Sequence, residues 1–106
     1  MSVEISVNGE VMTAYLSGEL DHHSAAAIRK QIDNSADLNM PSLLVFDFTR
    51  VSFMDSSGIG LVMGRYRNLS RRGTKFHITG TSPQIYKVMK LSGISKLATI
   101  DEVKGD

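Results

Sequence analysis

The sequence predicts an α/β fold: a single domain over residues 1–106, with a mostly parallel sheet of about five strands, an N-terminal hairpin and flanking helices. Three observations lead to this prediction. Strand-like and helix-like segments follow one another in the order β-β-α-β-α-β-α-β, which is typical of a largely parallel sheet. The length of 106 residues suits one domain. Apolar residues make up 42% of the chain and charged residues 22%, as in ordinary globular proteins.

The N-terminal hairpin is indicated by two short segments on either side of a tight turn. Apolar and polar residues alternate over residues 3–7, as in a half-buried strand. Asn8 and Gly9 both tolerate the positive φ angles of a two-residue turn. Residues 11–16 are then the expected return strand.

The first helix is expected after the polar segment 19–23. Ser24 is a favoured N-cap residue, and Ile28 and Ile32 recur at the spacing of one helical face. Residues 34–41 have little periodicity and end in a proline, so we expect a loop there, into which the helix could extend a residue or two past Ser35.

The central strand and the helix that follows it carry strong patterns. Residues 43–48 are almost continuously apolar, which favours a strand covered on both faces. From Ile59 onward, apolar residues recur at helical spacing, and Gly73 stands where a helix stop is expected. The arginines between residues 65 and 72 suit the negative end of the helix dipole. We expect them to form a solvated helix face, part of which is available to a partner.

The last third of the chain continues the alternation. Residues 74–79 are expected to form a strand, and residues 97–100 a last short strand. Between them, Ser82 as N-cap and Pro83 as first residue predict a helix that Gly93 closes. Its expected buried stripe comprises Ile85, Val88 and Met89.

The composition excludes several classes of function. The chain has no cysteine, so disulfides, thiolate metal sites and thiol catalysis are ruled out. Twelve Lys and Arg against eleven Asp and Glu give a net charge of +1, which provides no general attraction to nucleic acid or to an anionic membrane. The first ten residues lack a targeting signal and the longest apolar run has four residues, so a cytoplasmic location is expected.

The most informative segment lies between the central strand and the following helix. It places Asp55, Ser56, Ser57, Gly58 and Gly60 at the carboxyl end of a strand, where sites gather in open α/β sheets. The free N–H groups and the positive dipole end of a helix start favour an anion. The segment is therefore expected either to bind a phosphate or to receive one.

Enzyme motifs do not fit this segment. A nucleophile elbow centred on Ser56 would need glycine where Met54 stands, and the chain contains no phosphate-binding P-loop. A small serine hydrolase using Ser56 with His22 or His23 as base remains a weaker alternative. No metal site is expected, because His22 and His23 are adjacent and His77 lies within a predicted strand. No cofactor motif occurs.

An ordinary structural role would also explain the segment. Asp and Ser are common caps of helices, with Ser57 as a candidate N-cap. Gly60 and Gly64 could serve only to let the helix approach the sheet closely. The residue pattern alone leaves both explanations open.

Several separated segments together resemble one family. They are residues 18–23, 52–60, 64–66, 82–83 and 91–93, in the same order along nearly the whole chain. The sequence is similar to the anti-sigma factor antagonists, which are single STAS domains, and the segments 18–23 and 64–66 favour the branch that acts in sporulation. Antagonists of the general-stress anti-sigma factors are the alternative within the family.

The resemblance implies a phosphorylation switch rather than an enzyme. The unmodified protein would bind an anti-sigma factor that is also a serine kinase, and so release a sigma factor. That kinase would phosphorylate Ser56, with Ser57 as the rival acceptor, and a serine phosphatase would restore binding. The free protein would be a monomer with no nucleic-acid or membrane partner. The partner-binding residues implied are Glu19, Asp21, His22, Asp55, Ser57, Gly58 and Ile59.

Overall fold

The computed structural model describes residues 2–102 as one five-stranded sheet with three α-helices. The strands are β1 (Ser2–Asn8), β2 (Val11–Leu20), β3 (Leu43–Met54), β4 (Lys75–Thr79) and β5 (Thr99–Ile100). The α-helices are α1 (His22–Asn39), α2 (Ser56–Leu69) and α3 (Pro83–Ser92), and the 3-10 turns are η1 (Ser70–Arg72) and η2 (Ile94–Lys96). The strand order is β1-β2-β3-β4-β5, antiparallel between β1 and β2 and parallel elsewhere. The predicted fold class is confirmed.

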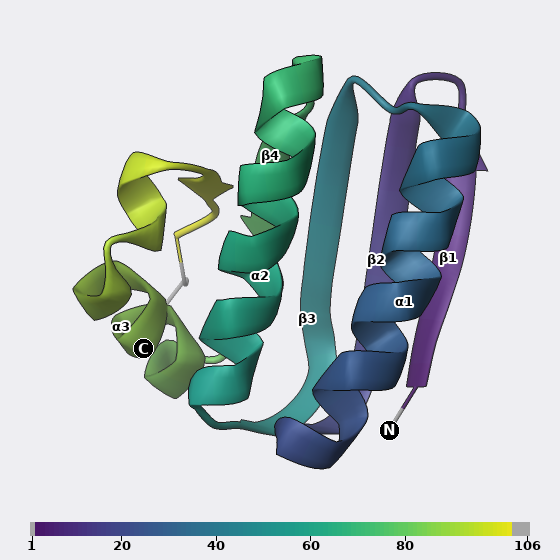
Figure 1. Ribbon diagram of the computed structural model, residues 1–106. Helices are drawn as coiled ribbons and strands as arrows, with labels where there is room; N and C mark the ends of the chain where they lie inside the picture. The colour runs from purple at the N-terminus through teal and green to yellow at the C-terminus, as the bar shows by residue number, and fades with distance from the viewer. Residues whose placement is uncertain (1, 103–106) are drawn as a thin grey trace.

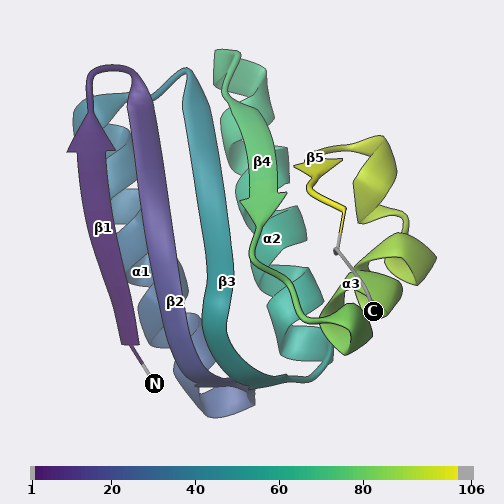
Figure 2. The same cartoon turned by 180° about the vertical axis from the view of Figure 1, so that it is seen from behind.

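The two long helices lie side by side on the same face of the sheet (Figure 1). Seen from behind, the strands are in front and no helix crosses them (Figure 2). From β2 to β5, each strand pairs with the next strand in the chain, so the sheet grows in one direction only. Connections between parallel strands are almost always right-handed, and right-handed connections that all advance in one direction place their helices on the same face of the sheet. No helix in the described part of the chain is long and apolar enough to cross a membrane.

The burial of β3 corrects one prediction. Leu44, Phe46 and Phe48 are buried beneath the helices, whereas Leu43 and Val45 point to the opposite face and are only partly buried. The expectation that this strand is covered on both faces was wrong. The sequence pattern suggested burial on both faces because Leu43 and Val45, which lie on the uncovered face of the sheet, are also apolar.

Helix α1 is longer at both ends than the sequence suggested. Asp21, not Ser24, is its N-cap residue, and the helix continues to Asn39, so the loop predicted at residues 34–41 begins only at Met40. The extension buries Ala36 one turn beyond Ile32, and near the helix end the Asn39 side chain donates to the carbonyl oxygen of Ser35 at 2.8 Å. The helix ends at Met40, which adopts φ 46°.

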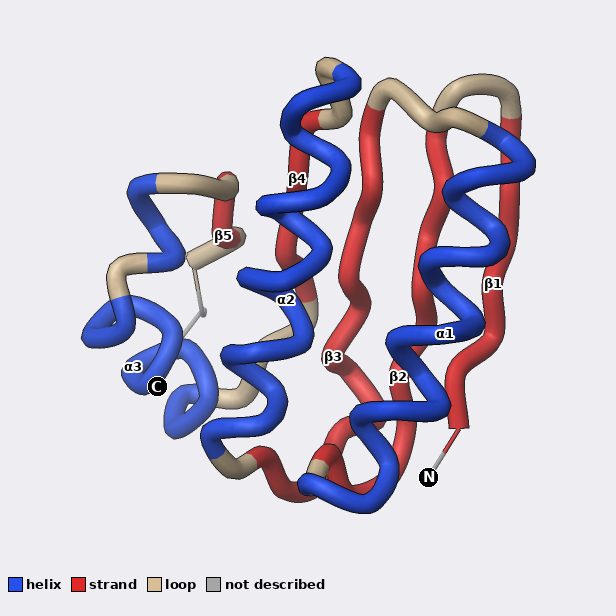
Figure 3. The backbone as a smooth tube through the Cα atoms, in the orientation of Figure 1, coloured by secondary structure: helices blue, strands red, loops and turns tan. Residues whose placement is uncertain are grey.

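The link between β3 and α2 is also tighter than expected. Strand β3 runs to Met54, well past the predicted end at residue 48, and α2 begins at Ser56, so Asp55 alone connects them (Figure 3). Later elements agree better, because Ser82 caps α3 with Pro83 as its first residue. Val88, however, is 40% exposed instead of buried.

Candidate functional site

The starts of α1 and α2 meet at one end of the sheet. Leu20 and Met54 end their strands as neighbours in the ladder between β2 and β3. The residues that follow them, Asp21 and Asp55, are the N-caps of the two helices. The backbone N–H of Asp55 also donates to the carbonyl oxygen of Leu20 at 3.2 Å. Both helices therefore begin beside each other, with their positive dipole ends at the same place.

The start of α1 is held by a reciprocal capping box. The Asp21 carboxylate accepts a hydrogen bond from the Ser24 N–H at 3.0 Å, and the Ser24 hydroxyl accepts one from the Asp21 N–H at 3.1 Å. The bond from the Ser24 N–H is the main cause that lowers the pKa of Asp21 below its ordinary value. Asp21 is thus an anion at neutral pH.

The start of α2 uses a carboxylate in the same way. Asp55 accepts a hydrogen bond from the Ser57 N–H at 2.7 Å, and its carbonyl oxygen accepts one from the Gly58 N–H at 3.0 Å. Ser57 is therefore not the N-cap. Ser56 is exposed as the first residue of the helix, and no described residue hydrogen-bonds to its hydroxyl, whereas Ser57 is half-buried.

Gly58 allows α2 to begin tightly against the strands. It is buried, and a Cβ at this position would overlap the side chain of Met54 and lie 3.0 Å from Cδ2 of Leu20. A larger residue would push the start of the helix away from the ends of β2 and β3. Gly58 thus fixes the place of Ser56 relative to the sheet.

A groove of about 270 Å³ separates α1 from α2 and begins beside Ser57. Small residues form much of its lining, namely Ala25, Ala26, Gly60 and Gly64. Its polar lining consists of His22, Arg29, Ser57 and Arg65. The close-approach explanation for the two glycines was wrong, because a Cβ at either Gly60 or Gly64 would meet no heavy atom within 4 Å.

Arg65 also departs from the prediction of a solvated arginine face. It is only 4% exposed, and its Nε lies 2.7 Å from Oδ1 of Asp33 on α1, although this pair lacks hydrogen-bond geometry. Arg72 instead is exposed and pairs with Asp37 at 2.8 Å. The spacing of Arg65 from the buried Leu61 and Leu69 was the available signal that it lies on the inward side of α2.

The predicted site residues fall into three groups. Asp21, His22, Asp55 and Ser57 gather with Ser56 around the two helix starts. Glu19 is exposed near the end of β2, where its carbonyl oxygen accepts a hydrogen bond from the Ser24 hydroxyl at 3.2 Å. Gly58 is buried, as described above. Ile59 does not line the groove and packs partly against the core.

The histidines form neither a metal site nor a catalytic pair in the described residues. His22 and His23 lie in the first turn of α1, not in an extended loop, with ring centroids 6.1 Å apart. No cluster of three or more potential metal ligands occurs within residues 2–102. In this range neither histidine makes a hydrogen bond to Ser56, so the geometry gives no support to a serine hydrolase.

Comparison with known proteins identifies the family. The family model of the STAS domain matches residues 2–105. An anti-sigma F factor antagonist from Lysinibacillus sphaericus is 34% identical, over 93% of this chain and 91% of that protein. Another from Paenibacillus polymyxa is 30% identical over 94% and 86%, and an anti-sigma-B factor antagonist from Listeria monocytogenes is 26% identical over 87% and 80%.

Solved structures agree with these relatives. The unphosphorylated form of the anti-sigma factor antagonist SpoIIAA matches with a TM-score of 0.82 and 33% identity, over 95% of this chain and 89% of that one. Its phosphorylated form from Bacillus matches with a TM-score of 0.75 and the same identity, over 95% and 92%. The chain therefore belongs to the STAS domain family. Its similarity to SpoIIAA and to proteins named anti-sigma F factor antagonists confirms the resemblance inferred from the sequence.

Proposed function

We propose that this protein is an anti-sigma factor antagonist that is switched by phosphorylation of Ser56. The unmodified form binds an anti-sigma factor that is also a serine kinase, and this releases a sporulation sigma factor. The kinase transfers the γ-phosphoryl group of ATP to the Oγ of Ser56, ADP leaves, and the hydroxyl proton passes to the kinase or to water. The phosphoprotein dissociates, and a serine phosphatase hydrolyses the ester. The protein is a ligand and a substrate, not a catalyst.

One observation carries the choice of acceptor. Ser56 is exposed at the first position of α2 with its hydroxyl free of described hydrogen bonds, while the neighbouring Ser57 is half-buried and faces the groove. A kinase active site must surround the hydroxyl that attacks ATP. Access therefore favours Ser56 over Ser57, a choice that the residue types alone left open.

The electrostatics of the site favour a switch without refolding. A phosphate adds about −1.5 to −2 charges at neutral pH. The start of α2 tolerates this charge because the helix dipole is positive there, and SpoIIAA resembles this chain in both its forms. A partner surface fitted to a neutral hydroxyl beside Asp21 and Asp55 does not tolerate it. A loss of roughly 2–4 kcal/mol, equivalent to about 30- to 1,000-fold in affinity, is expected.

The sequence identities to the two groups of relatives favour the sporulation branch. The two anti-sigma F factor antagonists are 30% and 34% identical to this chain, whereas the anti-sigma-B factor antagonists are 22–26% identical. Calorimetric titration of this protein with the anti-sigma F factor of its own organism, and separately with an anti-sigma-B factor, tests the choice. Tighter binding to the latter would assign the protein to general stress instead.

The acceptor is tested with purified anti-sigma F factor and ATP, followed by site-resolved mass spectrometry. Phosphate is expected on Ser56 in the wild type and in Ser57→Ala, and none on Ser56→Ala. Ser56→Ala is expected to retain binding, and Ser56→Glu to lose most of it. Stoichiometric labelling that survives Ser56→Ala would overturn the assignment, and a wild-type protein that is neither bound nor labelled would overturn the function.

A further inference from the structure

The groove between α1 and α2 lacks a packing purpose within this chain. Glycine is the least favourable helix-interior residue after proline, yet α2 carries Gly60 and Gly64 one turn apart. Neither position is crowded, because a Cβ there would meet nothing within 4 Å. Gly58, two residues away, is by contrast required by its neighbours Met54 and Leu20. The two later glycines thus keep open a space that the protein itself does not fill.

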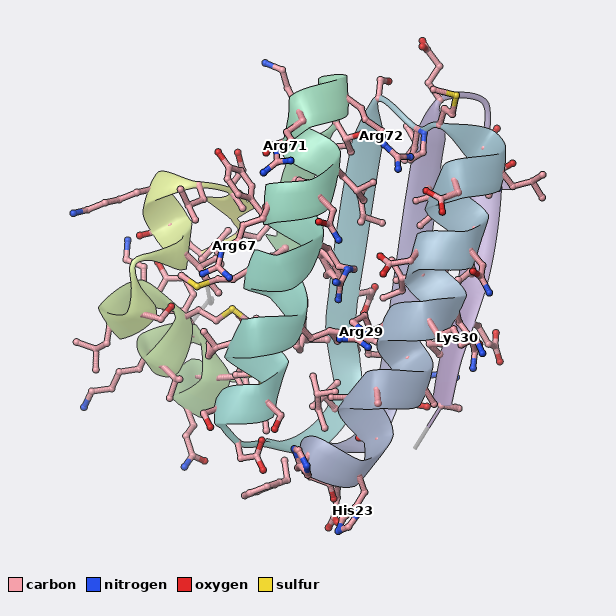
Figure 4. The ribbon with its side chains drawn as sticks, viewed as in Figure 1. His23, Arg29, Lys30, Arg67, Arg71 and Arg72 are labelled. Atoms are coloured by element: carbon pink, nitrogen blue, oxygen red, sulfur yellow. The ribbon has the colours of Figure 1, made fainter. Side chains whose placement is uncertain are left out.

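The groove is also positively charged. Arg29 and Arg65 both line it, His22 lies at its end, and no acidic residue contributes to its lining. Asp33 offsets the charge of Arg65 from outside the lining, which within residues 2–102 leaves Arg29 as the unpaired cation of the two. In Figure 4, Arg29 reaches from α1 toward α2, whereas Lys30 points to the other side of α1. The groove therefore combines small residues on its walls with cations, and it starts at Ser57 beside the proposed acceptor.

Arg65 is a buried cation, and not all of its N–H groups are hydrogen-bonded within the described residues. Its Nη1 makes one long hydrogen bond to the carbonyl oxygen of Leu61 at 3.4 Å, and its Nε faces Asp33 without hydrogen-bond geometry. No described residue accepts a hydrogen bond from Nη2. Burial, together with repulsion from Arg29, lowers the pKa of Arg65, while Asp33 opposes the change. Nη2 is not among the buried unpaired atoms, so it is open to solvent and can donate a hydrogen bond to an acceptor of a binding partner.

We propose that this groove receives an acidic side chain, Asp or Glu, from the anti-sigma factor. The carboxylate lies between Arg29 and Arg65, and the backbone that carries it approaches α2 over Gly60 and Gly64. The groove is then a second contact area that adjoins Ser56 and orients the kinase toward it. This inference rests on the proposed function, since it names how that same partner binds.

Two matched pairs of variants test the groove, with affinity for the anti-sigma F factor measured by calorimetric titration. Gly64→Ala and Asn34→Ala both improve helix propensity, but Asn34 is exposed on α1 and does not line the groove. Both are expected to raise the melting temperature by about 2–6 °C. Only Gly64→Ala is expected to weaken binding, and Gly64→Leu is expected to weaken it at least ~10-fold.

The second pair tests the charge of the occupant. Arg29→Glu and Lys30→Glu make the same change of charge at adjacent positions, one on the groove and one off it. Arg29→Glu is expected to weaken binding ~10- to 100-fold, and Lys30→Glu less than about threefold. Equal effects of the two, with Gly64→Leu still harmful, would show a neutral occupant and overturn the proposal.

The outcomes separate this inference from the function on which it rests. If the wild type binds the anti-sigma factor and is phosphorylated, but a well-folded Gly64→Leu binds equally well, the groove proposal fails and the function stands. If the wild type itself is neither bound nor phosphorylated, both fail. Weaker binding of Gly64→Leu and of Arg29→Glu, with unaffected Asn34→Ala and Lys30→Glu, supports the acidic occupant.

Discussion

Alanine substitutions at Gly58 and Gly60 are expected to change stability in opposite directions, although both glycines lie in α2. At Gly60 the new Cβ meets nothing within 4 Å, so the gain in helix propensity, about 0.5–1 kcal/mol, is expected in full. At Gly58 the new Cβ overlaps the Cγ and Sδ of Met54 and contacts Leu20, which is fully buried. Because the Cγ of Met54 is placed by χ1, relief requires a new rotamer for the whole side chain.

The magnitudes decide the sign at each position. Overpacking of this kind costs about 1–3 kcal/mol, which exceeds the propensity gain for a residue in the first turn of the helix. A net loss of roughly 0.5–2 kcal/mol is therefore expected for Gly58→Ala. For a domain of this size, 1 kcal/mol corresponds to about 4–8 °C in melting temperature. Gly58→Ala should then melt several degrees below the wild type, and Gly60→Ala a few degrees above it.

Urea unfolding followed by circular dichroism measures both variants. The midpoints are expected to move apart while the denaturant slope stays unchanged, because the surface exposed on unfolding is nearly the same. A Gly58→Ala protein as stable as Gly60→Ala would refute the reasoning, since it would show that Met54 leaves the start of α2 without cost. A changed slope would point instead to an altered unfolded state.

Three further predictions concern the caps and ion pairs. Asp55→Ala removes the hydrogen bond to the Ser57 N–H and is expected to cost about 1 kcal/mol by urea unfolding. Asp33→Asn leaves Arg65 buried without its carboxylate and is expected to cost about 1–3 kcal/mol, more than Arg65→Met, which removes the charge itself. Hydrogen bonds, first from Thr79 and then from His77, lower the pKa of Asp101 in the folded protein below the ordinary value of 3.8. The ionised Asp101 therefore contributes fully to the free energy of unfolding above pH 3.8, and this contribution is lost as the pH falls through the pKa of the folded state. Asp101→Asn should therefore lose less stability between pH 5 and pH 2 than the wild type, as measured by urea midpoints, and an equal loss would contradict this linkage.

The order of elements could be predicted because local patterns and chain order determine it. The turn at Asn8 and Gly9, the caps at Ser82 and Gly93, and the apolar run in β3 each act over a few residues. Parallel pairing of successive strands then follows from the helices between them. The same reasoning placed Ser56 at a helix start beyond a strand.

Tertiary partners explain what the sequence did not reveal. The last turns of α1 are mostly polar, but Ala36 continues the face of Ile28 and Ile32 and is fully buried in the core. The exposed pair of Arg72 with Asp37 adds little. Helices cover one face of the sheet because each connection leads to the next strand on the same side. The residue pattern of a single strand does not report this order of strands. The roles of Gly60 and Gly64 became clear only with the space around them.

The net charge of +1 conceals a strong separation of charge, and this separation affects the proposed switch. The helical segments contain nine Lys and Arg against two Asp, whereas the described strands and loops contain two Lys and Arg against eight Asp and Glu. Ser56 lies where these regions meet, between the capping carboxylates of Asp21 and Asp55 and the cationic groove that starts at Ser57. A phosphate there takes the net charge from +1 to about −0.5 to −1, and it places all of the added negative charge at the mouth of the groove. If an acidic side chain of the anti-sigma factor occupies the groove, the phosphate at the groove mouth repels it. Phosphorylation then weakens two adjoining contacts at once, which accounts for a large loss of affinity without any change of fold.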